Sequence, residues 1–267
     1  MHARWWLALL GVPLTLALPL LFAQGAPGNR WAQYEREMQN PVDDPPDANE
    51  KTEFAFARLR FRSPRDGWYY KRWGIDCNKS DRQFIQGFRR LTRVHARSIE
   101  QIVDIDSDEM FDWPFLYGVG VGDWKLSASQ AQRLRQYFDR GGFLMVDDFH
   151  GEREWATFMA GIYQVLPDAK VVELQDNDPI LNVVYDLKER IQVPGLNVVH
   201  GPGYERGGII PHWRAVIDDK GRVIAALCFN MDLGDAWEWA DLPEYPEKYA
   251  SMAYRLGINY IIYSMTH

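Results

Sequence analysis

Apolar and polar residues alternate in the stretch FAFARLRF, residues 54–61. A period of two is typical of a β-strand, so this stretch predicts the first strand of the folded domain. Residues 80–94 change to the period of a helix, in which Ser80 and Gln83 have the spacing of an N-terminal capping box. The apolar stripe of this helix is expected to consist of Phe84, Phe88 and Leu91.

The same change of period recurs along the chain. Strands are predicted at 96–105, 114–122, 143–147 and 170–174, and helices at 126–142 and 153–166. The run FLMV within 143–147 is apolar on both faces, as expected for a central strand that helices cover on each side. Regular alternation of strands and helices predicts an α/β fold with a mostly parallel, doubly wound sheet in three layers.

The helix at 126–142 has the clearest terminal signals. Ser127 and Gln130 have the spacing of a second capping box, and Gly141 with Gly142 supplies a left-handed end. Its buried stripe is expected to consist of Leu134, Tyr137 and Phe138.

The last part of the chain predicts a β-hairpin and a helix. Two antiparallel strands are expected within 212–232, around the turn at 218–221. The final helix lies within 246–267, and its inner face is expected to carry Tyr249, Met252, Ala253, Leu256 and Tyr260. Together these elements predict one α/β domain over residues 53–267.

The N-terminus has the layout of a secretory signal peptide, which we assign to residues 1–25. Arg4 precedes an uncharged run from Trp5 to Phe22, and small residues follow. The run is also long enough to span a bilayer, so an uncleaved anchor remains open. Residues 26–52 are rich in Pro and Asp and predict a polar tether. We therefore expect an exported protein, periplasmic or extracellular.

Composition narrows the function classes. The formal net charge is −7 and the sequence pI is about 5.4, which argues against a nucleic-acid binder, because phosphate contacts need a basic surface. The two cysteines, Cys77 and Cys228, belong to no metal-binding motif, and the sequence leaves their pairing open.

An apolar strand ends abruptly in polar residues in GGFLMVDDFHG, residues 141–151. Ligands of doubly wound sheets bind at the carboxyl ends of the strands, so Asp147, Asp148 and His150 are candidate catalytic residues if the protein is an enzyme. The alternative is that they cap a helix and form a turn.

Two more segments combine acids with aromatic residues and should reach the same edge of the sheet. They are WGIDCNKSD, residues 73–81, and CFNMDLGDAWEW, residues 228–239. Oxygen ligands in these segments would suit a divalent cation, and acids with indole rings would suit a sugar. No cofactor is evident, and a solvated acidic loop is the alternative. The candidate ligand-binding residues are Trp73, Asp76, Asn78, Asn230, Asp232, Asp235, Trp237 and Glu238.

Several common motifs are missing from the sequence. It contains no G-x-S-x-G or G-x-C-x-G nucleophile turn, no Walker loop and no dinucleotide-binding fingerprint. The stretch GVGVGDW, residues 118–124, lacks the spacing of a phosphate-binding loop and is interpreted as a strand end.

The motifs WGIDCNKSDRQF, LRQYFDRGGFLMVDDFHG and DDKGRVIAALCFNMDLGDAWEW, in this order, resemble the bacterial domain-of-unknown-function family 4159. The resemblance extends from about Phe54 to Thr266. It implies a fold similar to class I glutamine amidotransferases and to trehalose-utilisation-type domains, and it implies no activity. In that enzyme class a cysteine follows the strand that FLMVDDFHG resembles. Asp148 or Phe149 stands near that place here, which argues against thioester chemistry.

Two function classes remain open. The one we favour is a non-catalytic domain that binds a small molecule, a glycan or another envelope protein at an acidic, aromatic-lined site. The alternative is a carboxylate- or metal-dependent hydrolase that acts on a glycan or a related envelope substrate. In it, Asp147 or Asp148 is the base or a metal ligand, His150 is the acid, and Asp232 and Glu238 complete the site.

Overall fold

The computed structural model describes residues 44–66 and 72–267. The predicted signal peptide and residues 26–43 of the predicted tether lie outside these ranges. The end of the tether contacts the domain, because Ala48 is buried and Asp47 pairs with Arg89 at 3.0 Å. Within the described ranges, no helix is long and apolar enough to cross a membrane.

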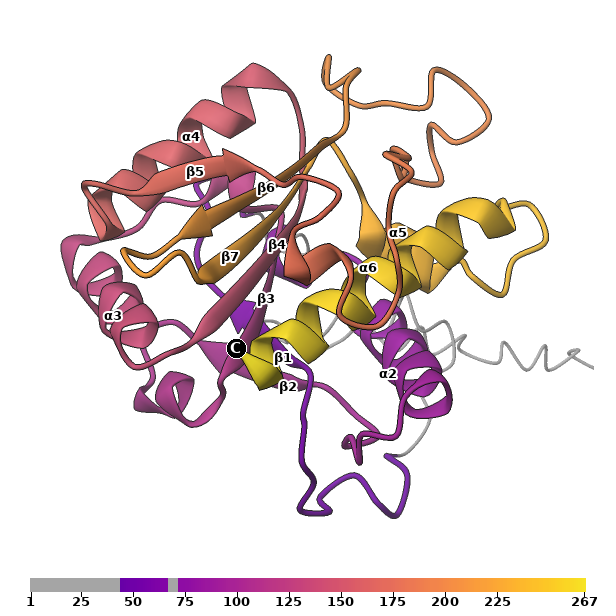
Figure 1. The fold of residues 1–267 in the computed structure, drawn as a ribbon, viewed down its shortest axis with the longest axis horizontal. Helices are drawn as coiled ribbons and strands as arrows, with labels where there is room; N and C mark the ends of the chain where they lie inside the picture. Colours follow the sequence, from indigo (N-terminus) through magenta and orange to yellow (C-terminus); the bar gives the residue numbers. More distant parts are fainter. Residues whose placement is uncertain (1–43, 67–71) are drawn as a thin grey trace, which may run out of the picture.

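One seven-stranded sheet forms the centre of the described chain, with the strand order β2-β1-β3-β4-β7-β6-β5 (Figure 1). The strands are β1 Ala57–Arg60, β2 Gln101–Asp104, β3 Phe115–Val119, β4 Phe143–Phe149, β5 Lys170–Glu173, β6 His212–Ile217 and β7 Val223–Phe229. The run from β2 to β7 is parallel, whereas β6 is antiparallel to both of its neighbours. The predicted mostly parallel α/β fold is confirmed.

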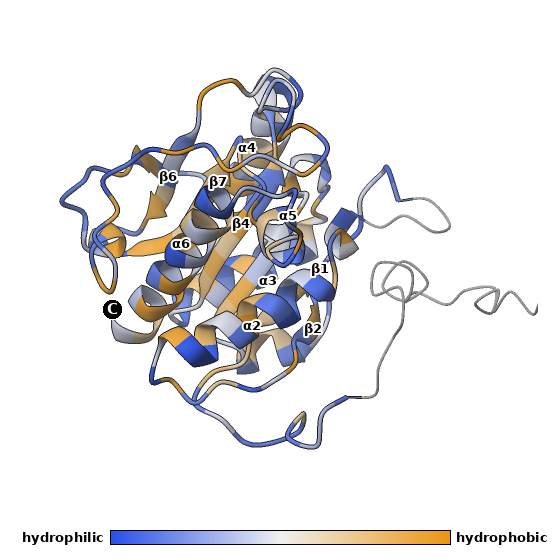
Figure 2. Cartoon of the chain, turned by 90° about the vertical axis from the view of Figure 1, so that its right-hand side faces the viewer, coloured by the Kyte–Doolittle hydropathy of each residue, from blue (hydrophilic) through white to orange (hydrophobic). Residues whose placement is uncertain are grey.

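Helices cover both faces of the sheet. Those longer than one turn are α2 Lys79–Leu91, α3 Ala128–Asp139, α4 Gly151–Val165, α5 Leu233–Glu238 and α6 Glu247–Thr266. Short 3₁₀ helices are η1 Arg72–Gly74, η2 Asp108–Asp112, η3 Val121–Asp123 and η4 Pro179–Leu181. Helices α2, α5 and α6 lie on one face, and α3 and α4 lie on the other (Figure 1). The apolar colouring concentrates in the strands between them (Figure 2).

The predicted hairpin is confirmed as β6 and β7, and the side chain of Asp218 accepts hydrogen bonds from the backbone N–H groups of Lys220 and Arg222 in its turn. The place of β5 differs from the expectation of a simple strand-helix-strand order. It lies at the sheet edge beside β6, because the hairpin strand β7 takes the place next to β4.

Of the two predicted capping boxes, the structure contains one and lacks the other. The box of α3 is confirmed, since Ser127 accepts from the Gln130 N–H and Gln130 accepts from the Ser127 N–H. The box predicted at Ser80 is wrong. Helix α2 begins at Lys79, and Ser80 instead accepts a hydrogen bond from buried Arg58 at 3.1 Å. Leu91, expected in the buried stripe of this helix, is 54% exposed.

Strand β4 is buried along its whole length, which confirms it as a central strand. A β-bulge interrupts its pairing with β7, between Val146 and Phe149, and Asp148 adopts a left-handed conformation there with φ 49°. The extra residue turns Phe149 toward Trp155 and Phe158 on the α3/α4 side. Bulges of this kind redirect side chains and are common beside functional sites.

A long connection without helix or strand runs from η4 to β6. We call residues 193–211 the strap. It lies along the carboxyl ends of β4 and β7, where Asp232 N–H donates to the Val193 carbonyl and Asn230 donates to the Ile210 carbonyl at 2.7 Å.

Candidate functional site

The carboxyl ends of neighbouring strands bring the predicted acidic segments together. Asp76 follows β1, Asp147 and Asp148 end β4, and Asp232 follows β7. Asp147 accepts from the backbone N–H groups at the start of α5, at 2.7 and 2.9 Å, and Asp76 Oδ2 lies beside Gly234 in the same turn, so the three segments meet. The predicted convergence at this edge therefore occurs.

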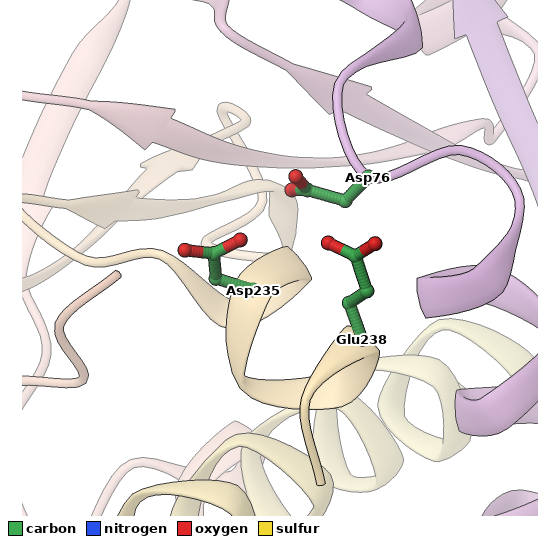
Figure 3. Close-up of side chains that lie close together, drawn as sticks. All are labelled: Asp76, Asp235 and Glu238. Atoms are coloured by element: carbon green, nitrogen blue, oxygen red, sulfur yellow. The ribbon is translucent and has the colours of Figure 1, made fainter. Parts of the chain in front are cut away.

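The closest group of carboxylates is Asp76, Asp235 and Glu238, which we call the acid triad. One oxygen from each side chain lies within 4.8 Å of those of the other two. Asp235 and Glu238 are three residues apart on α5, so they share one side of that helix, and Asp76 faces them from the loop after β1 (Figure 3). All three carboxylates point into the same space (Figure 3).

Arg58 positions the loop that carries Asp76. Its guanidinium donates to the backbone carbonyls of Trp73 and Ile75, at 3.0 and 2.9 Å. Asp76 itself has φ 59°, and its Oδ2 lies against the first turn of α5 beside Gly234. Arg58 lies on the first predicted strand, but alternation alone did not mark it as buried.

Burial and mutual repulsion both disfavour the charged forms of the carboxyl groups at this site. Burial first, and then the charges of Asp235 and Asp232, raise the pKa of Asp76 well above its usual range. Burial likewise raises the pKa of Asp232 well above its usual range and that of Asp235 to about 6. In the described part of the chain, Asp76 Oδ2 is buried and has no hydrogen-bond partner. A buried oxygen without a partner is costly, so Asp76 Oδ2 lacks a compensating donor or cation among the described residues. Asp235, by contrast, accepts from the Leu196 N–H at 2.7 Å and from the Trp239 indole at 3.2 Å.

Asp147 connects β4 to the start of α5. Its Oδ2 accepts from Tyr117 Oη at 2.9 Å and from the N–H groups of Leu233 and Gly234 at 2.7 and 2.9 Å. Burial raises its pKa to about 7 despite these donors. These hydrogen bonds give Asp147, a predicted catalytic residue, a structural role, because they attach the start of α5 to β4.

Asp148 lies beside one imidazole and two guanidinium groups. His150 Nε2 is 3.2 Å from its Oδ1, Arg72 Nη2 is 3.7 Å from its Oδ2, and Arg206 Nη1 is 3.8 Å from its Oδ1. Burial alone would raise the pKa of Asp148, but the hydrogen bond to His150 and the charge of Arg72 hold it below its usual range. These contacts favour the ionised form of Asp148.

His150 has the geometry of an imidazole oriented by a carboxylate. It is 2% exposed, and its Nδ1 has no hydrogen-bond partner among the residues that the structure describes. Its backbone N–H donates to Glu154 at 2.9 Å, at the beginning of α4. The pairing of Asp148 with His150 is thus the one place where the predicted catalytic residues contact each other through side chains.

The other predicted site residues serve the scaffold. Asn230 accepts from the Gly151 N–H at 2.9 Å, and Asp232 caps α5 by accepting from the Asp235 N–H at 2.9 Å. Asn78 donates to Glu100 at 3.1 Å. The segment expected to be an acidic loop is in part helix α5, for which the spacing of Asp232 and Asp235 was an unused capping signal.

The two indoles lie away from the acid triad. Trp237 is fully buried and packs on Phe84 with ring centroids 4.4 Å apart, and Trp73 is buried on the other face of the sheet beside Phe61. Neither of these two indoles lines the triad, whereas the indole N–H of Trp239 donates to Asp235 at 3.2 Å. The cysteines Cys77 and Cys228 are both free and buried.

Arg72 and Arg206 are the site residues that the sequence reasoning missed. Arg72 comes from η1, and its Nε lies 3.3 Å from Asp123. Gly120, with φ 64°, leaves room for this guanidinium directly after β3. The glycines of GVGVGDW therefore mark a close approach between segments at the predicted strand end.

The fold and the site define a three-layer α/β protein with a buried acidic centre at the carboxyl edge of its sheet. The family model described as Domain of unknown function (DUF4159) matches residues 55–265. The chain therefore belongs to this family. A search among curated proteins gave no match.

Proposed function

We propose that this protein is a binding domain that holds a divalent cation in its acid triad. The observation that carries the proposal is the meeting of Asp76, Asp235 and Glu238 within 4.8 Å. Oxygen ligands lie about 2.1 Å from Mg²⁺ and about 2.3–2.6 Å from Ca²⁺, so two oxygens on one ion are at most about 4.2 Å apart for Mg²⁺ and about 5.2 Å apart for Ca²⁺. Separations within 4.8 Å fit the limit for Ca²⁺ as they stand.

The charge balance supports the same proposal. Several carboxyl groups are buried together, and burial with mutual repulsion raises the pKa of Asp76, of Asp232 and of Asp235. A divalent cation would replace the protons that these groups otherwise retain. It would also provide a partner for Asp76 Oδ2. Asp147 and Asp232 then act by fixing α5, which carries two of the ligands.

The N-terminal sequence adds a proposed location. A basic residue, an uncharged run and small residues are the features of a signal peptide, so we propose that the domain works in the periplasm or outside the cell. There it would meet a small molecule, a glycan or another envelope protein.

The pair of Asp148 and His150 favours a second candidate function, a hydrolase. An imidazole oriented by a carboxylate is a common general base or acid. The distance of 3.2 Å between His150 Nε2 and Asp148 Oδ1 is the specific observation in its favour. A screen of acyl and phosphoryl esters tests it, and turnover that His150→Gln abolishes would favour the hydrolase over pure binding.

Calorimetric titration of the EDTA-treated protein with Mg²⁺, Ca²⁺ and Mn²⁺ tests the cation site. We expect one ion to bind per chain and Asp76→Asn and Glu238→Gln each to weaken binding at least about tenfold, because each removes a charged ligand. Asp168→Asn changes an exposed acid elsewhere and is the matched control. No binding of any of these ions, or equal binding by all variants, would refute the proposal.

A further inference from the structure

Asp235 is the half-buried member of the acid triad, and a donor holds each of its carboxylate oxygens. Oδ2 accepts from the backbone N–H of Leu196 in the strap at 2.7 Å, and Oδ1 accepts from the indole N–H of Trp239 at 3.2 Å. The indole is held in turn, because Lys79 Nζ lies 4.4 Å from the centroid of its ring. The carboxylate of Asp235 is therefore fixed from two directions.

The segments that carry the other two acids of the triad are fixed as well. Arg58 donates to two carbonyls of the loop that ends in Asp76, at 3.0 and 2.9 Å. Asp147 accepts from two N–H groups in the first turn of α5, at 2.7 and 2.9 Å, and Gln83 donates to the Glu238 carbonyl at its other end, at 3.1 Å. The loop and α5 can therefore approach each other only if these hydrogen bonds break.

Ca²⁺ and Mg²⁺ place different demands on such a frame. Mg²⁺ binds oxygens at about 2.0–2.1 Å in a near-ideal octahedron, whereas Ca²⁺ takes about 6–8 oxygens at about 2.3–2.6 Å in a flexible arrangement. Two ligand oxygens are at most about 4.2 Å apart on Mg²⁺ and about 5.2 Å apart on Ca²⁺. The triad oxygens lie within 4.8 Å of one another, which fits Ca²⁺ as they stand. The frame opposes inward movement toward the shorter bonds of Mg²⁺.

We propose that the acid triad selects Ca²⁺ over Mg²⁺, and that Trp239 sets this preference by holding the carboxylate of Asp235 in place. This inference rests on the proposed cation site. Trp239 is a positioning residue, because its N–H contacts a ligand carboxylate and not the ion. Without that N–H, Asp235 Oδ1 is free to turn toward a smaller ion.

Calorimetric titration of the full chain, treated with EDTA, tests the preference. We expect Ca²⁺ to bind the wild type at least about tenfold more tightly than Mg²⁺. Trp239→Phe removes the N–H and keeps an aromatic ring, and it should lower the ratio of the two affinities at least about threefold, because a hydrogen bond to a carboxylate is lost. Trp155→Phe is the matched control, since this half-buried indole stacks on Phe149 with ring centroids 6.3 Å apart. It should leave the ratio unchanged.

A second variant and a spectroscopic readout separate the positioning role from a general effect on the fold. Lys79→Gln loosens the indole without removing its N–H, so it should lower the ratio by a smaller factor. Tb³⁺, which replaces Ca²⁺ at oxygen sites, should show emission sensitised by the indole of Trp239. Ca²⁺ should displace Tb³⁺ at a lower concentration than Mg²⁺ does. Trp239→Phe should reduce the emission, and Trp155→Phe should not.

The outcomes distinguish this inference from the cation site itself. If Mg²⁺ binds as tightly as Ca²⁺, or if Trp239→Phe leaves the ratio of affinities unchanged, the proposed selectivity is overturned and the cation site stands. If Ca²⁺, Mg²⁺ and Mn²⁺ all fail to bind, both proposals are wrong. Tb³⁺ emission that Trp239→Phe leaves unchanged would place the ion away from Asp235 and would overturn both.

Discussion

Two buried charged clusters lie side by side in this domain, and they are built in opposite ways. In the first, Arg58 uses all its donors on Asp81, Ser80 and the carbonyls of Trp73 and Ile75. In the second, the acid triad collects carboxylates, and Asp76 Oδ2 has no partner among the described residues. The loop at residues 73–76 connects them.

The contrast indicates which cluster serves the fold and which serves a ligand. A buried ion pair whose groups are all hydrogen-bonded is complete by itself, and it fixes the loop geometry. A buried group of like charges raises the free energy of the folded state unless protons or a cation compensate. The hydrogen-bonded cluster of Arg58 thus positions the loop that brings Asp76 into the acid triad.

The largest expected effect comes from breaking the complete cluster. Arg58→Met should lower the free energy of unfolding by about 3–5 kcal/mol, because it leaves Asp81 buried and unpaired. Urea unfolding measures the loss. The control is Arg60→Met, whose partner Asp104 is half-exposed and whose loss should cost about 0–1 kcal/mol. Equal losses in the two variants would contradict the assigned role of Arg58.

The incomplete cluster should gain stability from its cation. At a free concentration of 100 times Kd, a bound ion raises the free energy of unfolding by about 2.7 kcal/mol. Urea unfolding with EDTA or with excess cation should show this rise in the wild type, and Asp76→Asn should lose most of it. In EDTA the same variant should be at least as stable as the wild type, because the repulsion within the triad decreases. A large loss of stability in EDTA would instead assign Asp76 to the fold.

Stability without the cation should fall as the pH rises from about 4 to 7. The folded-state pKa values of Asp147, about 7, and Asp235, about 6, exceed the ordinary aspartate value of 3.8. The folded state therefore retains protons that the unfolded state releases, and each such group lowers stability by about 1.4 kcal/mol per pH unit within its window. Asp148, whose pKa is lowered, acts only below that window. Urea unfolding in EDTA at pH 5 and pH 7 tests the sign. Asp147→Asn should reduce the pH dependence without abolishing it, because Asp235 also retains a proton in this window.

Periodicity predicted most of the sheet and its helices because strands and helices bury apolar stripes that repeat along the sequence. The convergence of Asp76, Asp148 and Asp232 was also predictable, since parallel strands place their carboxyl ends at one edge. The roles of individual residues could not be predicted from the sequence. Asp147 and Asp232 are bound to α5, and Trp237 lies in the core, which depends on contacts between distant segments. Arg206 belongs to a segment without periodicity and gave no signal.

The smallest expected effect concerns the strap that carries Arg206. A methyl group at Gly208 would collide with the amide of Asn230, whereas one at Gly201 would lie 3.6 Å from the Val198 carbonyl, an ordinary contact. Gly208→Ala should therefore cost about 1 kcal/mol or more and speed proteolysis within residues 193–211, and Gly201→Ala should change stability by less than about 0.5 kcal/mol. Equal behaviour of the two variants would mean that the strap is not seated on Asn230.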